Sequence, residues 1–300
     1  MGSDLRRATV LAVHNQFAAV RSDAGEGVAT IAGRLRHARP VVGDVVQLRE
    51  TPDGSLRIEE IEPRRGTLLR AGFRGRLQVV GANVDLLVIV AATTDPPLRA
   101  NLIDRYLVAA WAGGLEAALA LTKVDLPHDR VEVGRVTALL GRLGHAVVEV
   151  SIPENRGIEQ VRELVGMRRA VLAGHSGVGK TTLSNALTGR LDAIGAVNEI
   201  IGRGRQTTTV ARLIDLPGGG QLIDTAGIRS FGIAGVTPDR LQEAFPEIAA
   251  LGLDCRWQPC LHHEDEDGCV VDTSPEIDPE RLGSYRRILE DLEDERPTAK

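Results

Sequence analysis

The stretches "LALTKVDLP", residues 119–127, and "GHSGVGKT", residues 174–181, decide the fold of this 300-residue chain. The second stretch fits the pattern G-x-x-x-x-G-K-[ST] of a phosphate-binding loop. The first contains T-K-x-D, a pattern typical of loops that recognise guanine. Proteins that bind guanine nucleotides ordinarily have the phosphate loop first, so the order of the two loops is inverted here.

The phosphate loop stands in the context that its pattern requires. It follows the apolar stretch "RAVLA" and precedes "TTLSNAL", which predicts a strand before it and a helix after it. Backbone N–H groups of such a loop surround the phosphates, Lys180 reaches the β and γ oxygens, and the Thr181 hydroxyl ligates Mg²⁺. The predicted nucleotide-binding residues here are Gly174, His175, Ser176, Gly177, Val178, Gly179, Lys180, Thr181 and Thr182.

The predicted base is guanine. Asp125 follows an apolar stretch, so its carboxylate can accept hydrogen bonds from the N1–H and the exocyclic amine of guanine. Adenine has an acceptor at N1 and would leave this carboxylate unpaired, at a cost of roughly 1–3 kcal/mol. Lys123 would lie along the purine and Thr122 begins the loop, while Ser151 in "VEVSIPENRG" marks a second base-contacting loop.

Two switch segments follow the phosphate loop. "LIDTAG" places Asp224 where it can hold Mg²⁺ through water, and Gly227 where its N–H can meet the γ-phosphate. "RQTTT" offers Thr207, Thr208 and Thr209, of which Thr208 is our candidate for sensing Mg²⁺. The order of elements is base loop, second base loop, phosphate loop, first switch and second switch, which predicts a circularly permuted GTPase. Domain termini often lie close together, so this permutation is sterically acceptable.

The rest of the chain divides into three expected domains. Short apolar stretches and the turn signal "TPDGS" predict a small all-β barrel in residues 1–65. "IEPRRGTLLRAGFRGR" is interpreted as a connector. Strands expected at 86–92, 117–122, 146–151 and 170–173 alternate with helical patterns, one of them starting at an Asn101 cap. This alternation predicts an α/β domain with a parallel sheet over residues 66–235.

Residues 236–300 form the third expected domain. Thr237 and Asp278 are helix-cap signals, each followed by proline at the first helical position. The chain enters this domain directly after the second switch. A γ-phosphate that orders that switch can therefore reposition the domain.

All three cysteines of the chain lie in the third domain. Cys255, Cys260, His262 and Cys269 form C-x₄-C-x-H-x₆-C, a set of four ligands that leaves no open position, as in structural zinc sites. Chance clustering of buried cysteines explains this poorly, and a redox role lacks the C-x-x-C spacing. Because His263 adjoins His262, the sequence alone leaves open which histidine binds.

The composition is that of a globular protein, with 43% hydrophobic residues. The longest apolar run, "LLVIVAA", is far too short to span a membrane, and we expect a cytoplasmic protein. The net charge of −5 does not indicate nucleic acid binding. The segment 64–76 nevertheless has no acid, and it forms either a local basic strip or a solvated linker. Its arginines are Arg64, Arg65, Arg70, Arg74 and Arg76.

The sequence resembles the circularly permuted ribosome small-subunit-dependent GTPase A family over nearly its whole length. The resemblance rests on "QVVGANVDLLVIV", "NLIDRYLVAA", "GHSGVGKTTLSNAL", "GRQTTT", "DTAGIRSFG" and "CRWQPCLHHEDEDGC". It implies an OB-fold barrel, a permuted GTPase and a helical zinc domain that act late in 30S subunit assembly. We expect the protein to be a monomer. The implied partners are the 30S subunit, its 16S rRNA and assembly factors on it. The C-x-H spacing of the family favours His262 as the zinc ligand.

Three features depart from that family, namely Thr122, Gln206 and the spacing of the zinc motif. Thr122 stands where Asn is usual, which predicts a weaker tie between the base loop and the phosphate loop. Gln206 stands where His is usual; its amide either positions the attacking water or faces solvent. Ile228, where Ras-like enzymes have glutamine, cannot orient water, so slow intrinsic turnover is expected. The zinc motif is one residue longer between its His and last Cys. The expected catalytic residues are Gln206, Lys180, Thr181 and Gly227.

The expected function is hydrolysis of GTP to GDP as a timer for release from the 30S subunit. A non-enzymatic RNA-binding module with a relic phosphate loop and an ATP-dependent enzyme are the alternatives. "TKVD" with "DTAG" argues against ATP, and intact Lys180, Thr181 and Asp224 argue against a relic. Phe17 is the only aromatic residue in positions 1–65, so arginine contacts to the RNA backbone are expected rather than base stacking.

Overall fold

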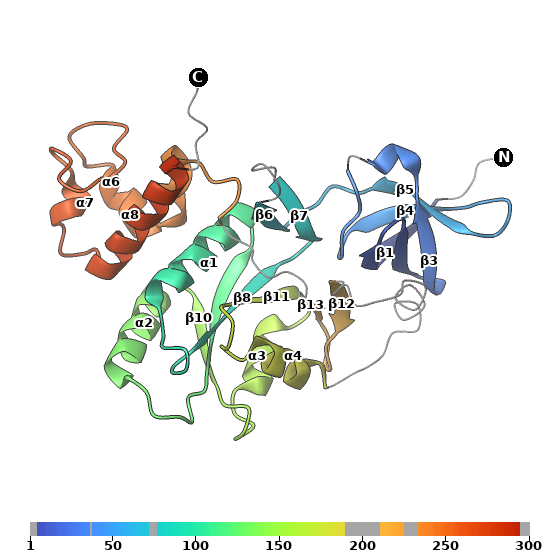
Figure 1. Cartoon of the computed structure of the whole chain (residues 1–300), viewed down its shortest axis with the longest axis horizontal. Helices are drawn as coiled ribbons and strands as arrows, with labels where there is room; N and C mark the ends of the chain where they lie inside the picture. Colours follow the sequence, from blue (N-terminus) through green and yellow to red (C-terminus); the bar gives the residue numbers. More distant parts are fainter. Residues whose placement is uncertain (1–4, 37, 72–76, 190–210, 225–232, 295–300) are drawn as a thin grey trace.

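The computed structural model describes residues 5–36, 38–71, 77–189, 211–224 and 233–294, which form three parts in a row (Figure 1). A β-barrel lies at one end, a sheet with helices in the middle and a helical part at the other end. Among the described residues, no helix is both long and apolar enough to span a membrane.

The amino-terminal barrel has five strands and closes on itself. The neighbours follow the order β1-β2-β3-β5-β4, and β1 also pairs with β4. Alternate apolar residues such as Val10, Val20 and Ile58 fill its interior. This closed five-stranded arrangement confirms the predicted barrel and is an OB fold. Its elements are β1 (Arg6–His14), β2 (Phe17–Ser22), β3 (Gly25–Ile31), η1 (Gly33–Arg36), β4 (Val45–Glu50) and β5 (Leu56–Ile61).

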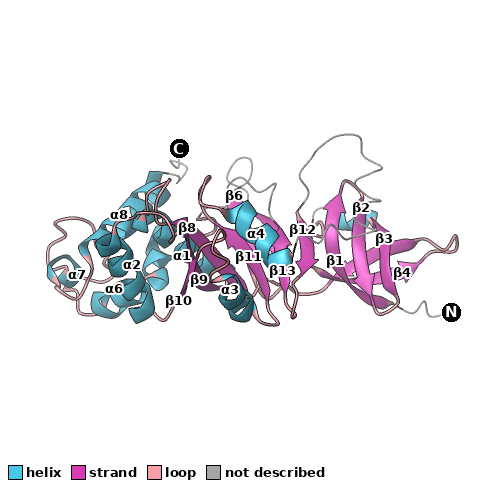
Figure 2. Ribbon diagram, turned by 90° about the horizontal axis from the view of Figure 1, so that it is seen from below, coloured by secondary structure: helices cyan, strands magenta, loops and turns pink. Residues whose placement is uncertain are grey.

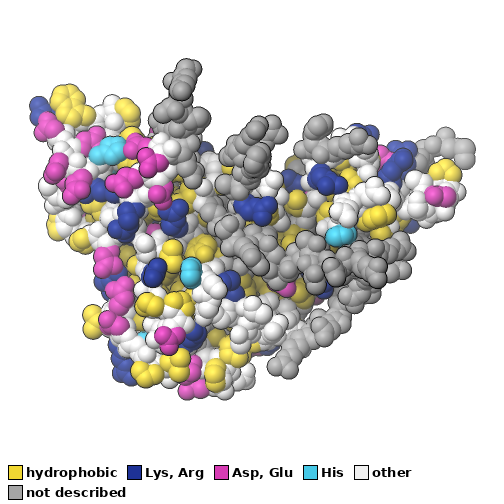
Figure 3. Space-filling view, in the orientation of Figure 1, with side chains coloured by type: hydrophobic (Ala, Val, Ile, Leu, Met, Phe, Trp, Pro, Cys, Tyr) yellow, Lys and Arg dark blue, Asp and Glu magenta, His cyan; other side chains and the backbone are white. Residues whose placement is uncertain are grey.

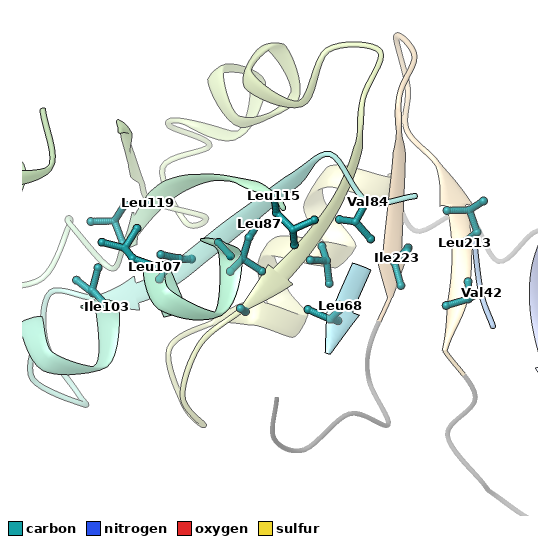
Figure 4. Packing of buried hydrophobic residues seen from close by; sticks show 14 of the residues in the cluster. Val42, Leu68, Val84, Leu87, Ile103, Leu107, Leu115, Leu119, Leu213 and Ile223 are labelled. Carbon is teal, nitrogen blue, oxygen red and sulfur yellow. The ribbon is translucent and has the colours of Figure 1, made fainter. Parts of the chain in front are cut away.

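The central sheet has the order β10-β9-β8-β11-β13-β12, and its strands are parallel except β12. The unbroken apolar run of β8 is explained by burial on both faces. Leu87 packs with α1 and α2 on one face, as Figure 4 shows for α1, and Val88 packs with α3 and α4 on the other. The elements are β8 (Leu86–Ala92), α1 (Ala100–Gly113), β9 (Glu116–Thr122), α2 (Arg130–Arg142), β10 (Ala146–Val150), α3 (Ile158–Val165), β11 (Arg169–Ala173), α4 (Lys180–Thr188), β12 (Arg212–Asp215) and β13 (Gln221–Asp224).

The strand order reverses between β8 and β11. The chain runs outward from β8 through β9 to β10, returns to place β11 beside β8, and continues to β13 and β12 on the other side. In open α/β sheets the ligand crevice lies at the carboxyl ends of the strands at such a reversal. The phosphate loop follows β11, so the permuted chain still brings it to the middle of the sheet.

A packed joint connects the barrel to the sheet. β1 pairs with β12 at Ala12 and Arg212, so the strands form one band from the sheet to the barrel (Figure 2). Arg169, at the start of β11, donates to the Gly43 carbonyl at 2.7 Å and to Gln221 Oε1 at 2.9 Å. Gly43 has φ +87°, and a Cβ there would lie 2.2 Å from the Ala82 carbonyl oxygen. The joint therefore has no room for a side chain at Gly43.

The predicted connector differs from the structure. Residues Thr67–Ala71 form β6, which pairs antiparallel with β7 (Leu77–Ala82) and packs against α1. Arg64 is not a free cation either, because its guanidinium makes a two-point ion pair with the fully buried Asp44, at 2.7 and 2.8 Å. Arg64 therefore fixes the barrel to the following hairpin.

The helical part contains η3 (Pro238–Ala244), α6 (Pro246–Gly252), α7 (Val270–Thr273) and α8 (Pro279–Asp294). Asp278 caps α8 as predicted, because its Oδ1 accepts from the N–H groups of Glu280 and Arg281. Thr237 precedes η3 without a side-chain capping bond. The Asn101 prediction was wrong: α1 begins at Ala100, and no side chain caps it.

A cluster of ion pairs joins the helical part of the molecule to the central part. Arg281 of α8 is 3% exposed and pairs with Asp104 of α1 and Glu247 of α6. Its guanidinium carbon lies 4.5 Å from the centre of the Phe245 ring. Burial raises the pKa of Asp104, and the positive charge of Arg281 opposes this rise. The helical part thus does more than follow the second switch in sequence; it is fixed to α1.

We predict that Arg281→Ala lowers the free energy of unfolding by about 3–5 kcal/mol, because it leaves the buried Asp104 and the partly buried Glu247 without their cation. Urea denaturation followed by tryptophan fluorescence measures this, since Trp111 of α1 lies under Arg240 at the same interface. Arg105→Ala is the control, because its pair with Asp291 is 38% and 57% exposed and should contribute less than about 1 kcal/mol. Equal losses in the two variants would contradict this role of the ion-pair cluster.

Candidate nucleotide site and metal cluster

The phosphate loop lies between β11 and α4. Gly174 has φ +156°, and a Cβ at this position would lie 2.1 Å from the Val90 carbonyl oxygen of β8. The Lys180 ammonium group donates to the His175 carbonyl across the loop. Burial lowers the pKa of Lys180, a cost that a bound phosphate would offset. With the amino terminus of α4 directed at the loop, the arrangement favours an anion.

The base loop carries an unpaired carboxylate oxygen. Asp125 Oδ1 is buried and has no hydrogen-bond partner among the described residues. A buried acceptor of this kind is costly unless a ligand supplies donors, and guanine offers two. Lys123 has φ 60°, and the Thr93 hydroxyl holds its carbonyl with a 3.0 Å hydrogen bond. The Lys123 ammonium group donates to the Asp95 carbonyl.

Thr122 ties the base loop to the phosphate loop. Its buried hydroxyl donates to the Val178 carbonyl at 2.6 Å. A weaker tie was expected from the absence of asparagine, yet the structure contains a short and buried bond. The smaller side chain suffices because the carboxyl end of β9 lies against the loop, with the Thr122 hydroxyl 3.8 Å from where a Cβ of Gly179 would be.

The second base loop and the candidate Mg²⁺ residues lie at the same edge of the sheet. Ser151 is fully buried, and its Oγ accepts from the Glu154 N–H at 3.3 Å, which orders the second base loop. Thr181 is exposed at the start of α4, and Asp224 ends β13, which is parallel to β11. A carboxylate and a hydroxyl are ligands that suit Mg²⁺.

The remaining predicted residues are not placed. Gln206, Thr208 and Gly227 lie outside the described residues, as does Ile228. Their assignment to water positioning, Mg²⁺ sensing and γ-phosphate contact stays a prediction.

Sequence reasoning missed two features beside the loops. Thr93, which supports Lys123, is the first residue after β8, and its polarity at the end of an apolar run was the available signal. A mostly apolar pocket adjoins the phosphate loop between β8 and α1, and its lining includes Pro96, Tyr106, His175 and Val178. No sequence pattern indicates this pocket, because residues 89–106 form it together with two residues of the phosphate loop, which is a separate part of the chain.

The predicted metal ligands do lie together. The ligand atoms of Cys255, Cys260, His262 and Cys269 are all within 4.8 Å of one another, and all four residues are buried. Nδ1 of His262 lies 3.8 Å from Cys255 Sγ and 3.5 Å from Cys269 Sγ. A set of three thiols and one imidazole at this spacing is compatible with one tetrahedral Zn²⁺.

His262, rather than His263, faces the cluster. Its Nε2 lies 3.3 Å from Gln242 Oε1, a contact that orients the ring as metal-bound histidines require. Nε2 of His263 instead lies 3.5 Å from Glu293. Burial raises the pKa values of Cys260 and Cys269 and lowers the pKa of His262. A divalent cation would stabilise the thiolates against this effect.

A phosphate loop after the central strand, a base loop tied to it and a reversed chain order define a circularly permuted P-loop GTPase. Comparison with known families agrees with this class, since the RsgA GTPase family matches residues 61–234. The chain belongs to the RsgA GTPase family and is therefore a GTP-hydrolysing enzyme.

Individual relatives support the same family. The small ribosomal subunit biogenesis GTPase RsgA of Ectopseudomonas mendocina is 42% identical over 84% of this chain and 75% of its own length. That of Azotobacter vinelandii is 41% identical with the same coverage. YjeQ from Thermotoga maritima has a TM-score of 0.76 and 28% identity, covering 96% of this chain and 99% of its own. YloQ, a circularly permuted GTPase, shares the fold with a TM-score of 0.73, covering 99% and 98% of the two chains at 24% identity.

We predict that Asp125→Asn weakens GTP binding by roughly 1–3 kcal/mol and favours xanthine nucleotides, whose C2 carbonyl can accept from the new amide. Titration calorimetry with GDP and xanthosine diphosphate measures both changes. Asp129→Asn is the matched control, because Asp129 caps α2 and its side chain retains a capping oxygen. An unchanged preference for guanine in Asp125→Asn would place the base elsewhere.

Proposed function

We propose that this chain hydrolyses GTP as a timer in late maturation of the small ribosomal subunit. The observation that carries the nucleotide choice is the buried, unpaired Asp125 Oδ1 beside the phosphate loop. The printed names of the curated relatives support the process, since they are small ribosomal subunit biogenesis GTPases. The same proposal places the protein in the cytoplasm, as a monomer on the 30S subunit.

Each loop has a role in this reaction. Lys180 neutralises the β and γ oxygens, while Thr181 would hold Mg²⁺ directly and Asp224 through water. The N–H of Gly227 would contact the γ-phosphate and Thr208 the Mg²⁺ ion, and the Gln206 amide would orient the attacking water. An amide positions water without removing its proton, so slow turnover is expected until a partner orders the first switch.

The joint between the barrel and the sheet gives the subunit a route to the switches. β12 lies in sequence between the two switch segments, and it pairs with β1 of the barrel. Arg21 of β2 also pairs with Asp215 of β12 at 2.7 Å. Binding of 16S rRNA at the barrel can therefore bias both switches through β12. Arg65 and Arg70 remain candidates for the phosphate contacts, whereas Arg64 is held by Asp44.

The non-enzymatic alternative is less favoured. A phosphate loop that no longer binds nucleotide would not need the hydrogen bond from Lys180 to the His175 carbonyl or the one from Thr122 to the Val178 carbonyl. ATP is disfavoured by Asp125, for which adenine offers no donor at N1.

We further propose that the four-ligand cluster holds one Zn²⁺. Three thiolates and one imidazole fill a tetrahedral shell, which gives the ion a structural role in the region from 236 to 300. The proposed boundaries of the other two domains are 1–65 and 66–235.

His262→Ala should remove the zinc and unfold the cluster region, because the shell loses a ligand and the thiols are buried. Metal analysis of freshly purified protein, with circular dichroism, measures this. His263→Ala is the matched control, since its ring faces Glu293, and it should retain one Zn²⁺ per chain. Wild-type protein without zinc would refute the assignment.

The timer predicts that saturating 30S subunits accelerate GTP turnover by at least about tenfold, equivalent to about 1.4 kcal/mol of barrier. The form with a GTP analogue should bind the subunit more tightly than the GDP form, and by linkage the subunit should raise the affinity for the analogue by the same factor. Single-turnover assays with 30S and, as a control, 50S subunits measure this.

Arg65→Ala combined with Arg70→Ala should weaken subunit binding and its salt dependence while intrinsic turnover stays near the wild-type rate. Stimulation below tenfold would favour a passive binding role.

A further inference from the structure

The segment 253–259, here called the tryptophan loop, carries two large apolar side chains into solvent. Leu253 is 79% exposed and Trp257 is 58% exposed, whereas Phe245 and Tyr285 of the same domain are fully buried. Some apolar side chains are visible at this end of the molecule, among basic and acidic ones (Figure 3). Tryptophan is enriched among the residues that contribute most to binding at protein interfaces, so this exposed ring is a candidate contact point.

The tryptophan loop is held in place from several sides. The Gln258 amide donates to the Gly252 carbonyl at 2.7 Å, and the Arg256 N–H donates to the Gly268 carbonyl at 3.0 Å. Cys255, in the middle of the loop, is buried in the metal cluster. The Arg256 guanidinium carbon lies 4.9 Å from the centre of the Trp257 ring. A side chain presented in this way loses little conformational entropy when a partner covers it.

An acidic turn, residues 264–267, adjoins the loop. All four of its residues are acidic, and Glu264, Asp265 and Asp267 are exposed. The Arg256–Gly268 bond brings the turn beside the loop, and Asp267 lies 3.7 Å from Arg256. These charges would repel an RNA backbone and attract a basic protein surface.

We propose that the tryptophan loop and the acidic turn dock onto a basic protein surface of the small ribosomal subunit, rather than onto rRNA. The inference rests on the proposed function, which brings the chain to that subunit. Trp257 and Leu253 supply an apolar centre that excludes water, and Glu264 and Asp265 supply a rim of complementary charge. Arg65 and Arg70, which lie beside and in β6 in the middle of the molecule (Figure 1), are left for rRNA.

Trp257→Ala tests the apolar centre. Its affinity for purified 30S subunits should fall by about tenfold or more, while its affinity for protein-free 16S rRNA should change less than about twofold. Zinc content and intrinsic turnover should match the wild type. Met167→Ala is the control, because Met167 is 83% exposed on a turn of the central domain, and it should bind both probes normally.

Neutralising the acidic rim should change the affinity for 30S subunits in opposite directions, depending on whether the partner is a protein or RNA. The double variant Glu264→Gln and Asp265→Asn should bind 30S subunits about threefold or more weakly if the partner is a basic protein, and more tightly if it is RNA. Tighter binding, or an equal loss with protein-free rRNA in Trp257→Ala, overturns the proposal. Normal 30S binding by Trp257→Ala overturns this inference and leaves the proposed function standing. Wild-type protein that fails to bind 30S subunits overturns both.

Discussion

The hydrogen bond from the Thr122 hydroxyl to the Val178 carbonyl is the constraint on which the nucleotide site depends. In the permuted chain the base loop precedes the phosphate loop, and the two loops are not neighbours in sequence. Their alignment therefore depends on contacts in the folded structure. Parallel pairing of β8 with both β9 and β11 brings their carboxyl ends to one edge, and this bond then sets the distance between the loops. The site is therefore defined by the sheet, and the order in which its strands occur along the chain has little effect on its geometry.

Sequence patterns predicted the parts of the fold whose causes are local. Examples are the apolar run of β8, the glycines of the phosphate loop and the Asp278 cap of α8. Each can be recognised from a few consecutive residues of the sequence. The misplaced Asn101 cap was a local error, whereas two larger errors come from distant partners. The strand β6 forms because residues 77–82 pair with it, and Arg64 is immobilised because Asp44 is buried beneath it. The cluster at Cys255 was predictable because its ligands are close in sequence, yet only the fold distinguishes His262 from His263.

The barrel also shows why composition says little about its partner. Its arginines are numerous, but many have acidic partners, including Arg6 with Glu50 and Arg7 with Glu62. Such pairs cancel the field that attracts nucleic acid at a distance. The proposed rRNA recognition by this domain would therefore depend more on shape and on the few remaining cations than on net charge, which agrees with a chain whose overall charge is −5.

The pairing of β1 with β12 joins residues 12 and 212, which are 200 positions apart in the chain. During synthesis the barrel is complete once β5 has emerged, long before β12 exists. The sheet then grows from β8 through β10 in one direction and adds β11 to the edge left open on β8. Contacts of such long sequence separation form late because loop closure opposes them. Pairing of β12 with the already folded barrel is thus a late folding event. A nascent chain acquires its connection between the barrel and the switches only after both nucleotide loops have been synthesised.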